Sequence, residues 1–111
     1  HVGLGSDVAG GSTENLFTAM SQAIQASKLR WRLQDDSLKP LTAEEVFYMA
    51  SKGGGAFFGK TGSFEPGYEF DAVIIDDSRL IHPQPLTVKR VIYLGDEREV
   101  YGKYACGEKI L

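Results

Sequence analysis

The first third of the chain repeats apolar residues at the spacing of an amphipathic helix. The repeat runs at intervals of three and four residues and comprises Leu16, Phe17, Met20, Ala23, Ile24, Ser27 and Trp31. This stripe predicts a helix over residues 13–32, with Ser12 as the N-cap that accepts a hydrogen bond from the first turn. Ahead of the helix, apolar residues at 2–4 predict a short buried strand that ends in a glycine-rich loop over residues 5–11.

A capping box marks the start of a second helix. In Thr42-Ala43-Glu44-Glu45, the Thr42 side chain can accept from the Glu45 N–H while the Glu45 carboxylate accepts from the Thr42 N–H. The pattern that follows predicts four inward-facing side chains, namely Val46, Phe47, Met49 and Ala50. We expect the helix to end in a left-handed C-cap at the glycines of residues 53–55, followed by one short turn at residues 56–58 that Gly59 closes.

The second half of the chain has the pattern of short strands. Glu65-Pro66-Gly67 places Pro and Gly where a type II turn needs them, and two prolines mark residues 77–85 as a loop. Runs of β-branched and aromatic residues predict strands at residues 70–76, 91–94, 100–106 and 109–111. A hairpin turn at residues 107–108 would join the last two. The order strand, helices, strands indicates an α/β fold.

Composition narrows the class of protein. The 111 residues are 42% apolar and carry 15 acidic against 12 basic side chains, a net charge of -3. Such a chain suits one small unit with a core, and its charge argues against a nucleic-acid partner. The sequence has no apolar run of the roughly 20 residues that a membrane span requires, and no signal peptide. The single cysteine, Cys106, excludes an internal disulfide, fits a reducing compartment, and is interpreted as a small packing residue in a strand.

Asp7 is the strongest candidate for chemistry. It follows a short apolar strand and precedes Gly10-Gly11, which is where β/α-barrels place catalytic groups. The alternative is that Asp7 only accepts hydrogen bonds within its own turn. The glycines around it lack the spacing of a phosphate-binding motif, so they favour close backbone packing. Two histidines, His1 and His82, and one cysteine cannot form a self-sufficient zinc site at a recognised spacing.

Several motifs resemble those of the amidohydrolase superfamily. Residues 2–11 resemble the last barrel strand of its deaminases, with the loop that reads Gly-Ser/Thr-Asp, and residues 62–74 resemble the return into its small β-domain. Residues 47–55, and above all Tyr93-Leu94-Gly95-Asp96-Glu97-Arg98, are similar to the guanine deaminases of this superfamily. The resemblance extends over essentially the whole chain but only over the C-terminal quarter of such an enzyme.

The resemblance implies a fold, an activity and a role for Asp7. Residues 1–61 would form the last strand and C-terminal helices of a TIM-type (β/α) barrel, and residues 62–111 the strands of a small β-sandwich domain. Asp7 would be a ligand of the single catalytic zinc and the catalytic group that exchanges protons with the metal's water, in the hydrolysis of guanine to xanthine and ammonia. The complete enzyme would be a cytosolic homodimer. Its binding partner would be the small-molecule substrate guanine, and it would bind neither nucleic acid nor a membrane.

The chain also departs from the resembling enzymes. It lacks their His-x-His pair, their later barrel histidines, their catalytic glutamate, their base-reading side chains and a few residues between Lys89 and Arg90. We therefore expect the 111 residues alone to show neither deaminase activity nor stoichiometric zinc. The open alternatives are a deaminase or chlorohydrolase of another heterocycle and, in a different class, an autonomous, non-catalytic α/β binding module.

Overall fold

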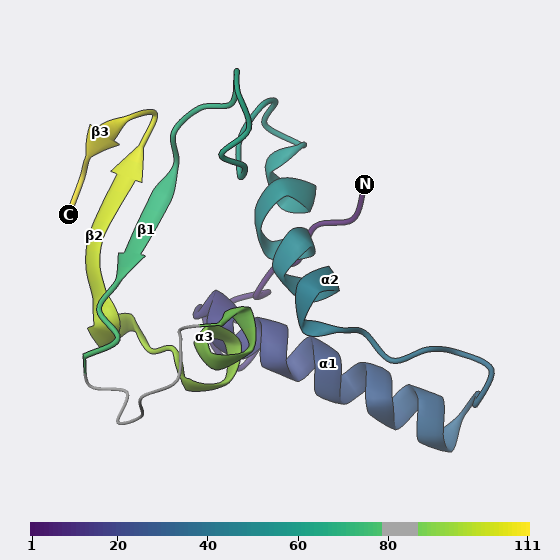
Figure 1. The fold of residues 1–111 in the computed structure, drawn as a ribbon. Helices are drawn as coiled ribbons and strands as arrows, with labels where there is room; N and C mark the ends of the chain where they lie inside the picture. Colours follow the sequence, from purple (N-terminus) through teal and green to yellow (C-terminus); the bar gives the residue numbers. More distant parts are fainter. Residues whose placement is uncertain (79–86) are drawn as a thin grey trace.

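The computed structural model describes residues 1–78 and 87–111, and confirms the mixed α/β content. The elements in chain order are α1 (Leu16–Leu33), α2 (Ala43–Tyr48), the π-helical η1 (Met49–Gly53), β1 (Ala72–Ile75), α3 (Val88–Leu94), the 3-10 helix η2 (Glu97–Glu99), β2 (Val100–Ala105) and β3 (Glu108–Lys109). Figure 1 shows α1 and α2 on one side of the molecule and the three strands on the other, with α3 between them. His82 and its neighbouring prolines lie outside the described residues.

Helix α1 begins at a different cap from the one expected. The Asn15 side chain caps it, with Oδ1 accepting from the backbone N–H of Phe17 at 2.8 Å and of Thr18 at 3.4 Å. Ser12 instead accepts from Gln22 Nε2 at 2.9 Å. The predicted N-cap at Ser12 is therefore wrong, because Asn15 caps equally well and stands directly before the apolar stripe.

The capping box of α2 is confirmed. Thr42 N donates to Glu45 Oε2 at 2.7 Å, and Glu45 N donates to Thr42 Oγ1 at 3.2 Å. Val46 is completely buried, as predicted, whereas Phe47 is 41% exposed, so its expected inward position is wrong. Phe47 follows Val46 by one residue, which turns its side chain about 100° away from the buried face.

The glycines after α2 do not end the helix. Gly54 has a helical φ of −69°, and the left-handed backbone appears only at Gly59, with a φ of +113°. The reason lies in packing: a Cβ on Gly53 would stand 2.6 Å from the carbonyl oxygen of Val2. The C-cap expected at residues 53–55 is therefore wrong, while the extra turn closed by Gly59 is confirmed.

Three helices share one apolar core. Its buried members are Met20 and Ile24 of α1, Ala43 and Val46 of α2, and Ile92 of α3. The strand predicted at residues 91–94 is wrong, because this segment is the helix α3. Thr87 caps that helix by accepting from Arg90 N at 3.3 Å. A four-residue apolar run fits either element, and packing against α1 and α2 selects the helix.

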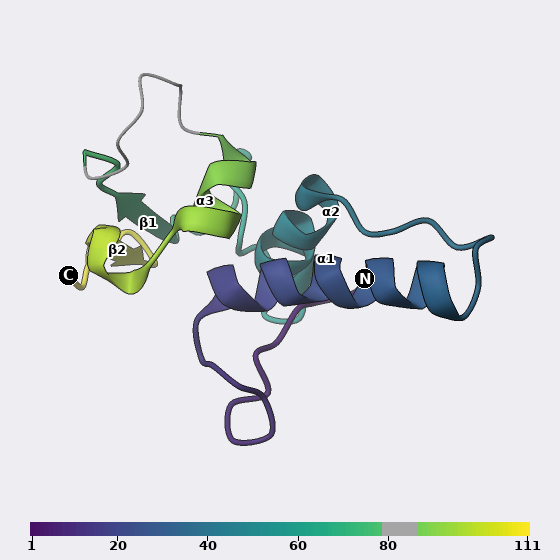
Figure 2. The ribbon, with the colours of Figure 1, turned by 90° about the horizontal axis from the view of Figure 1, so that it is seen from below.

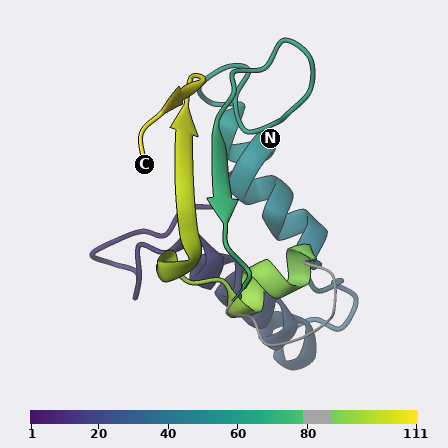
Figure 3. The same cartoon turned by 60° about the vertical axis from the view of Figure 1, so that its left-hand side comes forward.

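The strands form one antiparallel sheet in the order β1-β2-β3 (Figure 3). Ala72 pairs with Tyr104 and Ile75 with Val100, with a register shift between Ile74 and Ile75. The predicted strands at 70–76 and 100–106 and the final hairpin are confirmed, although the turn lies one residue earlier, at Cys106–Gly107. Both turn residues have positive φ, as in a type I′ turn. A second sheet, which a sandwich requires, is not present among residues 1–78 and 87–111.

A turn and an ion pair connect the helical part to the sheet. Tyr68 N donates to Glu65 O at 3.1 Å and Gly67 has a φ of +87°, which confirms the predicted type II turn. Lys52 of η1 pairs with Glu65 at 2.5 Å and lies 5.3 Å from the centroid of the Tyr68 ring. No helix in the described part of the chain is long and apolar enough to cross a membrane.

The N-terminal segment does not form the expected strand. Residues 2–6 pair with no strand of the described chain, and their backbone makes one long-range hydrogen bond, from Leu4 N to Met49 O at 2.9 Å. A strand requires a ladder partner, and in this structure the segment lies against α2 and η1 rather than beside the sheet. It then leads into the loop that carries Asp7.

Candidate active site

The loop around Asp7 is folded about a single backbone oxygen. The Asp7 carbonyl accepts hydrogen bonds from Gly10 N, at 2.9 Å, and from Gly11 N. Asp7 itself has a φ of +49°, and an isolated bridge joins Val8 to Gly11. The turn is therefore held by backbone groups, and it leaves the Asp7 side chain outside its hydrogen-bond network.

The Asp7 carboxylate is exposed and available. Within the described residues it makes no hydrogen bond and no ion pair. The alternative, that this side chain only accepts hydrogen bonds of its own turn, is not what the structure shows, because the backbone carbonyl takes that role. Figure 2 shows the purple segment before α1 as a loop that projects away from the helices.

Close packing explains some of the nearby glycines. A Cβ on Gly11 would collide with the carbonyl oxygen of Ser6 and come within 3.0 Å of that of Asp7. A Cβ on Gly3 would stand 3.0 Å from the Cα of Gly54, whereas one on Gly5 would meet nothing. The packing interpretation is thus confirmed for Gly3 and Gly11 but not for Gly5.

The C-terminal Tyr93–Arg98 motif runs from the end of α3 into η2, where the charged residues Glu97 and Arg98 are exposed but lie in an ordered turn. Asp96 caps η2 in a second capping box, with Asp96 N donating to Glu99 Oε2 at 2.7 Å. Arg98 donates to the Asp96 carboxylate from its backbone N at 3.0 Å and from its guanidinium at 2.9 and 3.2 Å. These bonds, the side-chain ones first, lower the pKa of Asp96 from 3.8 to about 2.

The same motif contacts the start of α1. Asn15 Nδ2 donates to Glu97 Oε2 at 3.2 Å, a hydrogen bond between residues 82 positions apart. Asn15 caps the helix that follows the Asp7 loop. Sequence reasoning missed this pair, although Asn15 stands at a capping position ahead of the Leu16-Phe17 start of the apolar stripe.

The described residues do not make a complete metal site. No group of three or more His, Cys, Asp or Glu side chains among them could hold a metal ion. Cys106 lies exposed in the β2–β3 turn rather than packed in a strand, so its predicted packing role is wrong. Its thiol donates to Glu69 Oε2 at 3.4 Å, and this carboxylate raises the pKa of Cys106. Without such a cluster, the candidate site among the described residues consists of the single carboxylate of Asp7, a group that zinc accepts as a ligand.

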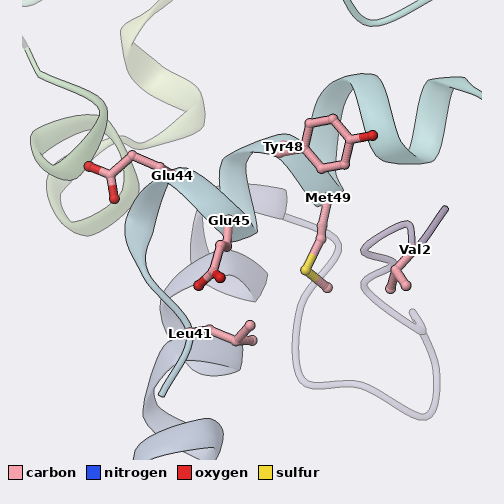
Figure 4. A pocket seen from close by; sticks show the side chains of 6 residues that line it. All are labelled: Val2, Leu41, Glu44, Glu45, Tyr48 and Met49. Carbon is pink, nitrogen blue, oxygen red and sulfur yellow. The ribbon is translucent and has the colours of Figure 1, made fainter. Parts of the chain in front are cut away.

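An apolar groove lies away from this loop. It has a volume of about 460 Å³ and is lined by Val2, Leu41, Glu44, Glu45, Tyr48 and Met49 (Figure 4). The Glu45 carboxylate in its wall already accepts the Thr42 N–H of the capping box. None of the lining residues belongs to the Asp7 loop, so the groove is not part of the candidate site.

Comparison with known proteins finds guanine deaminases that are similar to almost the whole chain. The Homo sapiens guanine deaminase is 31% identical over 99% of this chain and 27% of its own length, and that of Dictyostelium discoideum is 34% identical over 98% and 26%. The crystal structure of guanine deaminase from C. acetobutylicum with bound guanine in the active site has 46% identity and a TM-score of 0.91. It covers 100% of this chain and 27% of that chain.

The E. coli guanine deaminase structure is also similar, with 27% identity and a TM-score of 0.79 over 99% of this chain and 27% of that chain. The chain thus spans about a quarter of the length of the relatives that it matches. The sequence profile of the amidohydrolase family matches residues 1–108. Because this match includes all but the last three of its 111 residues, the chain belongs to the amidohydrolase family.

Proposed function

We propose that this chain acts as the C-terminal part of a guanine deaminase, an enzyme that hydrolyses guanine to xanthine and ammonia. The observation that carries the proposal is the similarity, over the entire chain, to a guanine deaminase whose structure holds guanine in its active site, at 46% identity. The relatives from Homo sapiens and Dictyostelium discoideum carry the same name and support the same substrate. We call the longer protein that would contain this chain the complete enzyme.

In this proposal Asp7 is a metal ligand and a proton carrier. Its carboxylate is exposed, unpaired within the described residues and held on a turn that its own backbone carbonyl organises. Zinc accepts carboxylate oxygens as ligands and, when bound, lowers the pKa of a water molecule enough to supply a nucleophile near neutral pH. The role of Asp7 itself is to take a proton on a carboxylate oxygen and to return it to the leaving amine.

The remaining ligands would come from other parts of the complete enzyme. A catalytic zinc needs about three protein ligands and an open position, and residues 1–78 and 87–111 offer no cluster of that size. Zinc is therefore proposed for the complete enzyme, with Asp7 as the one ligand supplied by the described residues.

We propose the same division of the chain as its sequence suggests, with residues 1–61 as the end of a barrel and residues 62–111 as part of a small β-domain. In support of it, the regular elements before residue 61 are helical, and all three described strands follow residue 70. Helix α3 belongs to the second part by sequence but packs into the core of α1 and α2, so the two parts share that core.

An autonomous binding module is less well supported by the surface of the chain. Phe57, Phe58 and Phe64 are 87%, 79% and 76% exposed, and large exposed apolar groups are unfavourable for a domain that stands alone in water.

A cytosolic location and a homodimer stay predictions of the sequence resemblance.

The test is a substrate panel on the purified complete enzyme. We expect guanine to be converted to equal amounts of xanthine and ammonia, at a kcat/KM well above that for cytosine or for aminated and chlorinated triazines. Metal analysis of the same sample should find zinc. Efficient turnover of another heterocycle without turnover of guanine would overturn the substrate assignment and favour a different deaminase or chlorohydrolase of the family.

A further inference from the structure

We propose that Glu97 is a positioning residue for the Asp7 loop. By accepting a hydrogen bond from Asn15, Glu97 holds the first turn of α1, which is the helix into which that loop runs. The inference rests on the proposed function, because the position of Asp7 matters for turnover only if Asp7 acts in the reaction. It assigns a role to the second acidic residue of the Tyr93–Arg98 motif, whose first, Asp96, caps η2.

The identity of residue 15 supports this role. The amide oxygen of Asn15 caps α1 by accepting from Phe17 N at 2.8 Å, while its amide nitrogen donates to Glu97 at 3.2 Å. An aspartate would cap the helix as well but has no hydrogen to donate when ionised. Asparagine is thus a side chain that can serve the helix end and the distant carboxylate at the same time.

Electrostatics favour the same contact. The first turn of α1 contains no acidic residue, although negative charge is favourable at a helix N-terminus. In addition to Glu14, which directly precedes the cap, Glu97 supplies a carboxylate there from a segment 82 residues later in the chain. The contact therefore combines a charge-assisted hydrogen bond with a charge that suits the helix dipole.

Glu97 is itself held in place. It lies in η2, where Asp96 and Glu99 form a reciprocal capping box and Arg98 binds Asp96 with two guanidinium nitrogens. Just before this turn, a Cβ on Gly95 would lie 3.4 Å from the Phe17 ring, so the backbone approaches the first turn of α1 closely. The carboxylate is thus presented to Asn15 by an ordered turn.

Hydrogen bonds and short backbone segments connect Asn15 to Asp7. Asn15 N donates to Thr13 Oγ1 at 3.0 Å, and Ser12 Oγ accepts from Gln22 of α1 at 2.9 Å. The amides of Gly10 and Gly11 then bind the Asp7 carbonyl. A shift in the first turn of α1 would pass along these links to Asp7, and displacement of a reacting group by about 1 Å can lower a rate by up to about 100-fold.

Four single variants of the complete enzyme test the inference. Glu97→Ala removes the acceptor, Asn15→Asp keeps the cap but removes the donor, and Glu97→Gln keeps an acceptor oxygen without the charge. Glu14→Gln is the matched control, because Glu14 is exposed beside the same helix end and has no partner within the described residues. Melting temperature identifies any variant that fails to fold.

We expect kcat for guanine to fall about tenfold in Glu97→Ala and Asn15→Asp, with KM within about twofold of the wild type. Glu97→Gln should keep kcat within about threefold of the wild type, because the glutamine oxygen can still accept the hydrogen bond from Asn15. In the metal-free protein, amide hydrogen exchange of residues 8–14 should become faster in the first two variants only. This second readout does not depend on catalysis.

The opposite results would overturn the inference. Unchanged kcat and unchanged exchange of residues 8–14 in both disruptive variants, even with a lower melting temperature, would reduce the contact to a structural one. Equal loss in Glu97→Gln and Glu97→Ala would contradict a role for the hydrogen bond itself. A wild-type enzyme that does not deaminate guanine would instead refute the proposed function, and with it the basis of this inference.

Discussion

At the scale of single residues, the Asp7 loop separates the groups that fold it from the group proposed to react. The backbone carbonyl of Asp7 accepts both amide hydrogens of Gly10 and Gly11, whereas the carboxylate makes no hydrogen bond within the described residues. A side chain that is not needed to hold its own turn is free to bind a ligand or exchange a proton.

The glycine at position 11 should be essential to this arrangement. In Gly11→Ala, the new Cβ would meet the carbonyl oxygens of Ser6 and Asp7, so the turn must shift. We expect guanine turnover by the complete enzyme to fall by about tenfold or more because Asp7 moves with the turn.

Ala9→Gly is the matched control in the same loop. Ala9 has a φ of +88°, a conformation that glycine adopts without strain, so this variant should melt at the same temperature as the wild type or higher. The account is contradicted if Gly11→Ala keeps full turnover, or if Ala9→Gly is the less stable of the two variants.

Single residues were predictable from the sequence where their chemistry is local. The sequence points to Asp7 through the glycines that follow it, and the structure places it on an exposed loop, although the strand predicted before this loop does not form. The pairing of Asn15 with Glu97 could not be predicted, because it depends on how α3 and η2 pack against α1 rather than on sequence spacing. The packing role predicted for Cys106 is wrong because the type I′ turn begins at Cys106, one residue earlier than Gly107 suggests.

At the scale of elements, η2 owes its order to the contacts of Asp96. In the folded protein these contacts lower the pKa of Asp96 to about 2, chiefly through the side-chain hydrogen bond from Arg98. A carboxyl with a depressed pKa contributes stability above its ordinary pKa and loses it as the pH falls through the folded value. The contribution of Asp96 is therefore present above about pH 4 and should be lost between about pH 4 and pH 2.

An NMR titration of the Asp96 side-chain carbon tests this. We expect a midpoint near pH 2 in the wild type. In Arg98→Gln, which removes the guanidinium that is the main cause of the lowered pKa, we expect a midpoint closer to 3.8. A wild-type Asp96 that titrates at 3.8 would show that the Arg98 contact is not formed in solution.

Elements were predictable where short-range chemistry determines them. The capping box at Thr42, the type II turn at Gly67 and the β2–β3 hairpin all depend on residues within a few positions of one another. The strand predicted at residues 91–94 is a helix, because a short apolar run is compatible with either element and only packing onto α1 and α2 decides. Residues 53–55 look like a helix end, but a Cβ on Gly53 would meet the carbonyl oxygen of Val2 and one on Gly55 would meet that of Thr61.

At the scale of the whole molecule, the chain spans about a quarter of the guanine deaminases that it matches. Its three described strands form one sheet, its helices share a core, and residues 2–6 pair with no strand of the described chain. The α/β content was therefore predictable, whereas a complete metal site was not, because no group of three or more His, Cys, Asp or Glu side chains among the described residues could hold a metal ion.

The 111-residue polypeptide, prepared alone, should show no deaminase activity and no stoichiometric zinc. A single exposed carboxylate binds a divalent metal weakly and leaves the pKa of bound water near that of the aqueous ion. The measurements are metal analysis after dialysis and ammonia release from guanine, with the complete enzyme as the positive control. One tightly bound zinc per chain, or ammonia release above background, would contradict this prediction.

The central claim is that Asp7 acts in the zinc chemistry of a guanine deaminase, and the variant Asp7→Asn in the complete enzyme tests it most directly. Asp36→Asn is the matched control, because it removes one exposed carboxylate from the linker between α1 and α2. We predict that Asp7→Asn keeps the melting temperature but lowers kcat for guanine by about 100-fold or more and weakens zinc retention, since an amide cannot take the proton. Wild-type turnover and wild-type zinc content in Asp7→Asn would contradict the claim.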